Sequence, residues 1–290
     1  MYDEPVFRPP SEAGSLIIQA TLGCSWNKCA FCEMYSSKKF RARPESDVFN
    51  EIKDFASYGG DVRKVFLADG NATVLSTDRL LRIMEVINET FPKVRRISSY
   101  ALPADLISKS DEELKQLFEA GLKLLYIGIE SGDDELLKLI NKSETAASTI
   151  EGINKAQKAG IQCSVMVLNG LGGKKYSQQH AINSAKLLNE IQPDFLSTLV
   201  LSFPYGEEHY KTKFAGDYQS MSTGELLAEL KLFLEFTDLK STVFRSDHAS
   251  NYLILKGILG RSKQGMIEKL EAAISDPESA GLRPEYMRGL

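Results

Sequence analysis

Short apolar runs alternate along this chain with longer stretches in which apolar residues recur at helical spacing. The apolar runs have the length of strands and lie at residues 15–21, 64–68, 96–101, 124–129, 162–168 and 195–201. Stretches of helical period follow at residues 45–57, 77–90, 111–120, 145–159 and 178–191. Because the predicted strands are almost continuously apolar, helices must cover both faces of the sheet, which is typical of parallel α/β folds.

Polar and glycine-rich segments follow several of the predicted strands. They lie at residues 24–32, 69–71, 130–132, 169–173 and 202–206. An open or partial barrel and a doubly wound sheet both satisfy the alternation, and both place their sites at the carboxyl ends of the strands. We therefore expect these loops to converge on one site. Beyond them, the pattern predicts helices at 222–236 and 263–273 and a short strand at 242–245.

Composition and charge limit the kinds of partner. The chain has 290 residues, of which 43% are hydrophobic and 26% are charged, and its net charge is −4. These values are ordinary for a globular protein and give no sign of a general nucleic-acid or membrane surface. A basic run at 38–43 is interpreted as a solvated face, with a phosphate, a reductase or RNA as alternative ligands. The sequence has no apolar run of about 18 residues and no apolar leader, so we expect neither a membrane span nor a signal peptide.

Three cysteines fall within nine residues, at Cys24, Cys29 and Cys32, and one more stands apart at Cys163. So crowded a set does not form a disulfide framework in a chain of this length, and we expect a reducing, cytoplasmic environment. Thiolates are the ligands that soft metals and iron–sulfur clusters prefer. Three of them can hold three irons of a [4Fe-4S] cube and leave the fourth iron open to another molecule. Cys163 lies inside a predicted strand and is expected to be a buried apolar residue.

Zinc is the main alternative for this cysteine segment. A structural zinc site normally has four closed ligands. The fourth would have to come from Cys163, His180, His209 or His248, and none of these has a short spacing to the three cysteines. His180 and His209 are expected at the surface. A cluster therefore fits the segment better than zinc.

The aromatic residue Phe31 stands directly before Cys32. With it, the cysteine segment resembles the cluster-binding loop of the radical S-adenosylmethionine (radical SAM) superfamily. In the family pattern three residues separate the first two cysteines, whereas four, residues 25–28, separate Cys24 from Cys29 here. This departure suggests a distinct subgroup.

The resemblance covers most of the chain. It implies a partial barrel of six β/α units, in agreement with the alternation of strands and helices. It places the core barrel at residues 1–206 and a helical C-terminal extension, which closes the substrate site, at residues 207–290.

The resemblance also implies where the amino group of SAM binds. The family has a short motif after its second strand, and here that place is taken by Ala68, Asp69, Gly70 and Asn71. The usual Gly-Gly-Glu is absent, but the Asp69 carboxylate and exposed main-chain carbonyls can accept hydrogen bonds from an ammonium. An ordinary Asp-Gly turn is the alternative.

Two further segments resemble SAM-binding parts of the family. Glu130 and Ser131 match polar residues of the fourth strand that contact the ribose or the methionine carboxylate, with helix capping as the alternative. Residues 165–173 resemble the fifth-strand segment that lies along the adenine, although its usual acidic end is missing. Val167 and Asn169 are therefore expected to contact SAM, as is Phe31.

The chemistry that the resemblance implies is radical chemistry. SAM binds the open iron, an electron from the reduced cluster splits it into methionine and a 5′-deoxyadenosyl radical, and this radical takes a hydrogen atom from the substrate. Such an enzyme needs a one-electron donor such as flavodoxin or ferredoxin. Cys163 cannot build a second cluster by itself, which argues against sulfur-inserting members and members with auxiliary clusters.

Hydrogen-bonding groups are dense in residues 244–252, near the expected end of the barrel. Substrate contacts are predicted for Tyr205, Arg245, Asp247, His248 and Asn251. Asp247 and His248 form a candidate catalytic acid–base pair, because a histidine beside a carboxylate titrates near neutral pH. An ordinary polar loop is the alternative interpretation.

The sequence predicts a small, polar substrate and a lyase or oxidoreductase reaction. One single-cluster subgroup of the superfamily cleaves queuine, a 7-deazaguanine base, and the chain resembles it in size and in its single cluster. A tetrapyrrole-related oxidase is the second hypothesis, although a substrate with several carboxylates should need a mouth lined by Arg and Lys. A non-catalytic metal-binding or electron-transfer module is the third.

Overall fold

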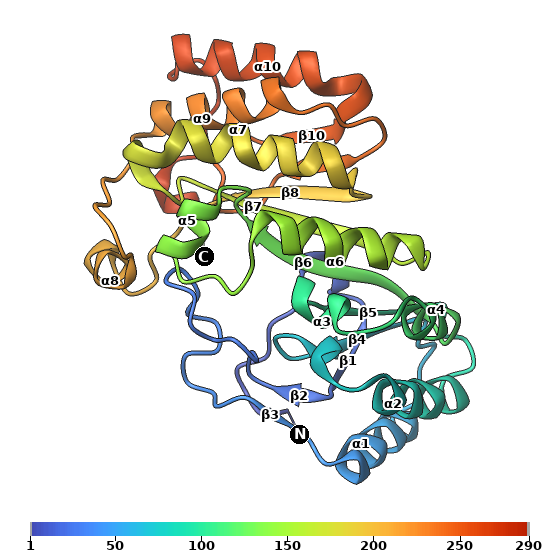
Figure 1. Ribbon diagram of the computed structural model, residues 1–290. Coiled ribbons are helices and arrows are strands. Elements are labelled where there is room, and N and C mark those ends of the chain that lie inside the picture. Colours follow the sequence, from blue (N-terminus) through green and yellow to red (C-terminus); the bar gives the residue numbers. More distant parts are fainter. Residues whose placement is uncertain (1, 289–290) are drawn as a thin grey trace. The chain divides into compact units, whose positions relative to one another are not determined.

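The computed structural model describes residues 2–288 (Figure 1). The chain divides into two compact units. The first contains the described chain up to Asn27, with Cys32–Ile127 and Glu151–Cys163. The second contains Lys28–Phe31, Gly128–Ile150 and the described chain from Ser164 onward.

Eight strands of the described chain form one sheet that is not closed. In hydrogen-bonding order they are β1 (Leu16–Gln19), β4 (Lys64–Ala68), β5 (Arg96–Tyr100), β6 (Leu122–Glu130), β7 (Gln162–Asn169), β8 (Phe195–Val200), β9 (Val243–Ser246) and β10 (Leu255–Ile258). Pairing is parallel from β1 through β6 and from β7 through β9, whereas β9 and β10 pair antiparallel. A separate small sheet joins β2 (Thr21–Leu22) to β3 (Arg41–Ala42).

Helices of the first unit bury one apolar face each. They are α1 (Glu45–Ser57), α2 (Thr77–Thr90), α3 (Pro103–Ile107) and α4 (Asp111–Glu119), with the 3-10 helices η1 (Pro10–Glu12) and η2 (Ala72–Val74). In α2, the residues Leu80, Met84 and Ile87 recur at helical spacing and are almost fully buried. Ser110 begins α4 with a capping box, because its side chain accepts from the N–H of Glu113 while the Glu113 carboxylate accepts from the N–H of Ser110.

Helices of the second unit are α5 (Asp134–Leu139), α7 (Gly173–Ile191), α8 (Glu207–Lys213), α9 (Thr223–Phe236) and α10 (Leu259–Ser275), with the 3-10 helix η3 (Glu285–Met287). The helix α6 (Ala146–Lys158) begins in this unit and ends in the first. Figure 1 shows α9 between α7 and α10, and it packs against both. A core cluster joins α5, β7, α7 and α8 through Leu136, Leu168, Tyr176 and Tyr210.

The α/β fold predicted from the apolar runs is confirmed, with differences at particular elements. The helix predicted at 178–191 begins earlier, at Gly173, because glycines that indicate a loop in the sequence stand here at the first turn. The strand β10 is not predicted, since its residues Leu-Lys-Gly-Ile form too short an apolar run. Cys163 is fully buried in β7, as expected. The division at residue 206 into a barrel and an extension stays a prediction.

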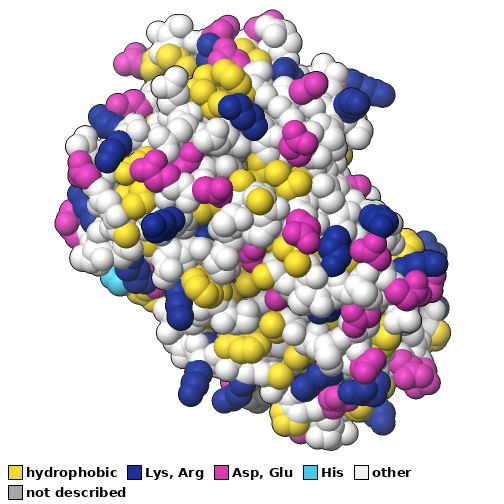
Figure 2. All heavy atoms as spheres, viewed as in Figure 1, with side chains coloured by type: hydrophobic (Ala, Val, Ile, Leu, Met, Phe, Trp, Pro, Cys, Tyr) yellow, Lys and Arg dark blue, Asp and Glu magenta, His cyan; other side chains and the backbone are white. Residues whose placement is uncertain are grey.

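None of the described helices is both long enough and apolar enough to span a membrane. On the face seen in Figure 2, acidic and basic side chains are interspersed, in keeping with the small net charge of −4. A cytoplasmic location stays a prediction.

Candidate active site

The predicted cluster ligands lie on the segment between β2 and β3. Cys24 and Cys32 belong to the first unit, and Cys29 belongs to the second. All three carry thiols rather than disulfides and are partly exposed. Within residues 2–288, no three His, Cys, Asp or Glu side chains are arranged to hold a metal ion. The role of Cys24, Cys29 and Cys32 as metal ligands therefore stays a prediction from the motif. The donor chemistry of three accessible thiols fits an iron–sulfur cluster.

The turn after β4 binds the main chain on both sides of Cys24. The N–H of Gly23 donates to Oδ2 of Asp69 at 2.9 Å. The N–H of Ser25 donates to Oδ1 of Asn71 at 3.0 Å, and Nδ2 of Asn71 donates to Oγ of Ser25 at 2.8 Å. Residues 68–71, to which the resemblance assigns the SAM ammonium, therefore contact the cysteine segment.

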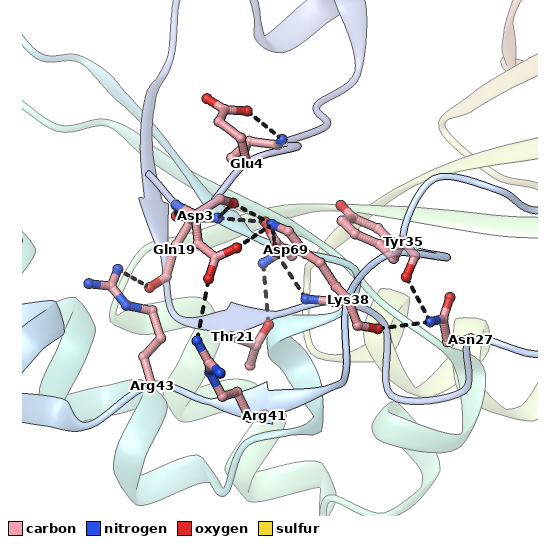
Figure 3. Close-up of polar contacts among 12 residues, drawn as sticks. Asp3, Glu4, Gln19, Thr21, Asn27, Tyr35, Lys38, Arg41, Arg43 and Asp69 are labelled. Atoms are coloured by element: carbon pink, nitrogen blue, oxygen red, sulfur yellow. Dashed lines mark hydrogen bonds and ion pairs between the residues drawn. The ribbon is translucent and has the colours of Figure 1, made fainter. Parts of the chain in front are cut away.

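Asp69 is fully buried, and both of its carboxylate oxygens accept hydrogen bonds (Figure 3). Oδ1 accepts from Nε2 of Gln19 at 3.0 Å, and Oδ2 accepts from Nζ of Lys38 at 3.0 Å in addition to Gly23. The Lys38 side chain is only 6% exposed, so this is a buried ion pair. Ala68, at the end of β4, is likewise buried. Asp69 is satisfied by donors of its own chain, and its contact with a SAM ammonium stays a prediction.

Two side chains of the basic run at 38–43 form ion pairs inside the first unit. Lys38 is neutralised in the ion pair just described, and Nη1 of Arg43 lies 2.7 Å from Oε2 of Glu51. The side chain of Arg41 is 68% exposed. The prediction of a solvated face holds for Arg41 and is wrong for Lys38 and Arg43, because carboxylates from elsewhere in the sequence neutralise them.

A second buried carboxylate supports Asn71. Nδ2 of Asn71 donates to Oδ2 of Asp105 at 2.9 Å, and Oγ1 of Thr73 donates to the same oxygen at 2.7 Å. Burial raises the pKa of the Asp105 carboxyl, whereas the bonds from Asn71 and Thr73 oppose that rise. Since a carboxylate can only accept, the amide nitrogen of Asn71 faces Asp105 and its oxygen faces the N–H of Ser25.

In the second unit, Glu130 at the end of β6 has an unusual backbone conformation and a buried carboxylate. Its backbone has a φ of 62°, a left-handed conformation that residues with a side chain adopt only under constraint. Its carboxylate is buried: Oε1 lies 3.4 Å from Nζ of Lys142, and Oε2 has no hydrogen-bond partner within residues 2–288. Burial raises the pKa of this carboxyl, and Lys142 opposes the shift. The described residues therefore leave one oxygen of this buried carboxyl without a hydrogen bond.

A buried histidine of α7 holds Ser131. Nδ1 of His180 lies 2.8 Å from Oγ of Ser131, and Nε2 lies 3.0 Å from the main-chain oxygen of Leu168. Because a carbonyl only accepts, Nε2 carries a hydrogen, and in the neutral ring Nδ1 accepts from Ser131. The expectation that His180 lies at the surface is wrong, since it is 2% exposed. Its spacing from the buried Tyr176 and Ser184 on α7 is the sequence signal that indicates this burial.

The other predicted SAM residues take part in packing within the second unit. Val167 is buried in β7, and Nδ2 of Asn169 donates to a main-chain oxygen of α9 at 3.0 Å. Phe31 packs against the core cluster, and Nζ of Lys142 lies 6.0 Å from its ring centroid. Lys142 therefore lies near both Phe31 and Glu130.

Most of the predicted substrate residues lie at or near the surface. Tyr205 is 62% exposed, and Nη1 of Arg245 lies 3.9 Å from Oδ2 of Asp247 in an exposed pair. Nδ1 of His248 accepts from the nearby N–H of Ser250 at 3.1 Å. Burial lowers the pKa of the His248 imidazole and outweighs the opposing effect of Asp247. The nearby charge of Arg283 lowers the pKa further, so the surroundings favour the neutral imidazole.

Asn251 is buried and completes the pairing of β8. Its Nδ2 donates to the main-chain oxygen of Thr198 at 2.8 Å, and its Oδ1 accepts from the N–H of Val200 at 3.1 Å. The side-chain amide thus replaces the backbone of a neighbouring strand. Its role as a substrate contact stays a prediction.

A cavity of about 390 Å³ lies in the second unit at the ends of β7 and β8. Two of the predicted loops, at 169–173 and 202–206, contribute to it. The five predicted substrate residues are not among its lining residues. Its polar lining includes Asn169, Ser202, Glu207, Tyr252, Glu285 and Arg288.

The end of the described chain forms part of this lining. The guanidinium of Arg288 lies 3.8 Å from the ring centroid of Tyr252 and pairs with Glu285 at 2.7 Å. Nη1 of Arg283 donates to the main-chain oxygens of His248 and Asn251. These contacts fasten residues 283–288 to the segment that follows β9.

Comparison with known proteins places these features in a family. Residues 18–188 match the family model described as the radical SAM superfamily. The heme chaperone HemW of Bacillus subtilis is 26% identical over 169 residues, which cover 56% of this chain and 44% of HemW. A putative methylthiotransferase of Methanocaldococcus jannaschii is 23% identical over 239 residues, which cover 76% of this chain and 51% of that protein. The chain spans about half the length of these curated relatives.

Solved structures of radical SAM enzymes share the fold. Coproporphyrinogen III oxidase (HemN) from Escherichia coli has a TM-score of 0.58 at 19% identity, covering 77% of this chain and 51% of HemN. The structure of anSMEcpe with bound AdoMet has a TM-score of 0.56 at 16% identity, covering 77% and 59%. At such identities the likeness concerns the fold. Because the family model spans more than half of the 290 residues, the chain belongs to the radical SAM superfamily.

Proposed function

We propose that this chain is an enzyme that cleaves SAM reductively and uses the resulting 5′-deoxyadenosyl radical to take a hydrogen atom from a small polar substrate. The three-cysteine segment 24–32, inside the region that matches the family model, carries this proposal. Members of the family use a [4Fe-4S] cluster and SAM. Cys24, Cys29 and Cys32 would hold the cluster, which when bound supplies the electron that breaks the C5′–S bond of SAM.

Anaerobic reconstitution tests this proposal directly. The protein should turn brown, take up about four irons per chain, and convert SAM to methionine and 5′-deoxyadenosine under a strong reductant. A zinc protein would stay colourless, and an electron-transfer module would be brown but leave SAM intact. Either of these results would contradict the proposal.

We assign Glu130 to SAM within this function. The buried Oε2 lacks a hydrogen-bond partner within residues 2–288, while Oε1 faces Lys142. A hydroxyl or ammonium hydrogen of SAM would satisfy the open oxygen. The constrained backbone at this position agrees with a residue whose conformation serves binding rather than stability.

Replacing Glu130 with glutamine should weaken SAM binding about tenfold to a hundredfold, since a hydrogen bond to a charged group contributes about 1.5–3 kcal/mol. Glutamine keeps the shape of the side chain and removes the charge. Equilibrium binding of SAM to the reconstituted protein measures the effect. Glu190→Gln changes an exposed carboxylate of α7 and is the control. Equal affinities of Glu130→Gln and the wild type would refute the assignment.

The Glu130→Gln variant should also alter the pH dependence of stability. Burial raises the folded pKa of Glu130 above its ordinary value of 4.5, so folding favours the protonated carboxyl. Its stabilising contribution is present below pH 4.5 and is lost as the pH rises through the folded pKa. In urea unfolding of the cluster-free proteins, the wild type should lose stability relative to Glu130→Gln as the pH is raised from about 4.5. Parallel pH profiles would contradict this.

We propose the cavity at the ends of β7 and β8 as the substrate site and a 7-deazaguanine base as a candidate substrate. Its volume of about 390 Å³ suits a small molecule. Arg288 is the basic residue of its lining and is balanced by the acidic Glu207 and Glu285. This balance favours a polar, nearly neutral molecule over a tetrapyrrole with several carboxylates. Formation of 5′-deoxyadenosine should therefore rise with heterocyclic bases and not with a porphyrinogen.

We also propose a reaction class, an electron donor and a further set of candidate contact residues. Hydrogen abstraction suits either a lyase or an oxidoreductase reaction, and a flavodoxin or ferredoxin is the proposed electron donor. The surface pair of Arg245 and Asp247, together with His248, stays a candidate for substrate or acid–base contact.

A further inference from the structure

We propose that Asp69, Gly70 and Asn71 form a clamp that fixes the main chain around Cys24, so that this turn positions a cluster ligand. The inference rests on the proposed function, since it gives Cys24 a cluster to bind. It assigns the turn after β4 a role in the cysteine loop, distinct from a contact with SAM. We call these three residues the Cys24 clamp.

The Cys24 clamp occupies the two N–H groups that flank the cysteine. Gly23 donates to Asp69 at 2.9 Å, and Ser25 donates to Asn71 at 3.0 Å. In return, the N–H of Gly70 donates to the main-chain oxygen of Gly23 at 3.0 Å. The bonds run in both directions, so they fix the position of the loop as well as its orientation.

Glycine is required at position 70 because the two segments approach closely. A Cβ atom there would lie 2.7 Å from both Cα and Cβ of Cys24 and 2.9 Å from the main-chain oxygen of Gly23. Such distances are well inside van der Waals contact. Any side chain at position 70 must therefore push Cys24 away from β4.

Both polar residues of the Cys24 clamp are themselves held in the interior. Asp69 and Asn71 are fully buried. The Asp69 carboxylate is tied to Lys38 and Gln19, as Figure 3 shows, and the Asn71 amide is tied to Asp105. Partners that orient a ligand in this way typically change metal affinity about 10–100-fold when they are mutated.

The spacer after Cys24 is anchored as well. Ser25 is bound by Asn71 through both its N–H and its hydroxyl. Nδ2 of Asn27, whose φ is 49°, donates to the main-chain oxygens of Tyr35 and Lys38. The longer interval between the first two cysteines is therefore an ordered part of the first unit up to Asn27.

Hydrogen exchange of the cluster-free protein tests the clamp itself. The amides of Gly23 and Ser25 should be protected in the wild type and should lose protection in Gly70→Ala and in Asn71→Ala. Gly14→Ala is the matched control, because a Cβ at that exposed glycine meets no atom within 4 Å. Rapid exchange at both amides in the folded wild type would overturn the clamp. This measurement needs no cluster, so it stands apart from the proposed function.

Iron release and spectroscopy of the reconstituted protein test the role of the clamp toward the cluster. Loss of iron to a chelator should be about 10–100-fold faster in Gly70→Ala and Asn71→Ala than in Gly14→Ala. The electron paramagnetic resonance spectrum of the reduced cluster, with and without SAM, should also change in the first two variants. Should Gly70→Ala fail to fold, Asn71→Ala carries the test. Iron release and spectra like those of the wild type would overturn the positioning role, whereas a wild type that takes up no iron would overturn the proposed function.

Discussion

Serine in place of Cys24, Cys29 or Cys32, introduced one at a time, is expected to abolish reductive cleavage of SAM. Each substitution replaces a soft thiolate with a hydroxyl, which is a poor ligand for the irons of a cluster. The cofactor carries the difficult step, so no residual pathway through the protein is expected. Iron content after anaerobic reconstitution and the yield of 5′-deoxyadenosine measure the effect.

Cys163→Ala is the control for this series. Cys163 is fully buried in β7, and its loss should cost about 1 kcal/mol of stability through the removal of packed atoms. The variant should retain both its iron and its activity. Full cleavage by any one of the three serine variants, or loss of the cluster in Cys163→Ala, would be incompatible with the assigned ligands.

Replacing Lys38 with methionine is expected to lower the unfolding free energy by about 3–5 kcal/mol, because it leaves the buried Asp69 carboxylate without its counter-ion. The two side chains are 6% and 0% exposed, and Nζ lies 3.0 Å from Oδ2. Urea unfolding of the cluster-free protein measures the loss. Lys39→Met removes the neighbouring, exposed charge and should change stability by no more than about 0.5 kcal/mol.

The double variant Lys38→Met with Asp69→Asn separates the ion pair from simple loss of packing. Asparagine removes the charge that Lys38 neutralises and keeps an oxygen that can accept from Gly23. The double variant should therefore be more stable than Lys38→Met, and the effects of the two substitutions should not add. A double variant that shows the sum of the two losses would mean that the pair contributes little.

The strands could be predicted because burial on both faces makes most of them rich in apolar residues, although β5 (Arg-Ile-Ser-Ser-Tyr) buries two serines. This pattern predicts β1, β4, β5, β6, β7 and β8. The strand β10 has too few apolar residues to be distinguished from a loop. Helix periods located α1 and α2 with the bounds that the structure has. These signals are local, so a single sequence contains them.

The surroundings of polar side chains could not be predicted in the same way. Lys38 lies in a basic run that resembles a solvated face, and its burial depends on Asp69, which is 31 positions away. Asn251 resembles a loop residue, yet its amide pairs with the main chain of β8. The cysteine spacing indicates a cluster by itself, but what holds Cys24 depends on a turn that follows another strand.

The hydrogen bonds at Gly23 and Ser25 are accepted by two side chains that the first unit buries, Asp69 and Asn71. Ordering one residue of backbone costs about 1–2 kcal/mol, and we expect the folding of the first unit to meet that cost before iron arrives. We therefore expect Cys24 to stay in position when oxygen damage strips the irons. Repair of the damaged protein should then require new iron and sulfide, with no renewed ordering of the chain around Cys24.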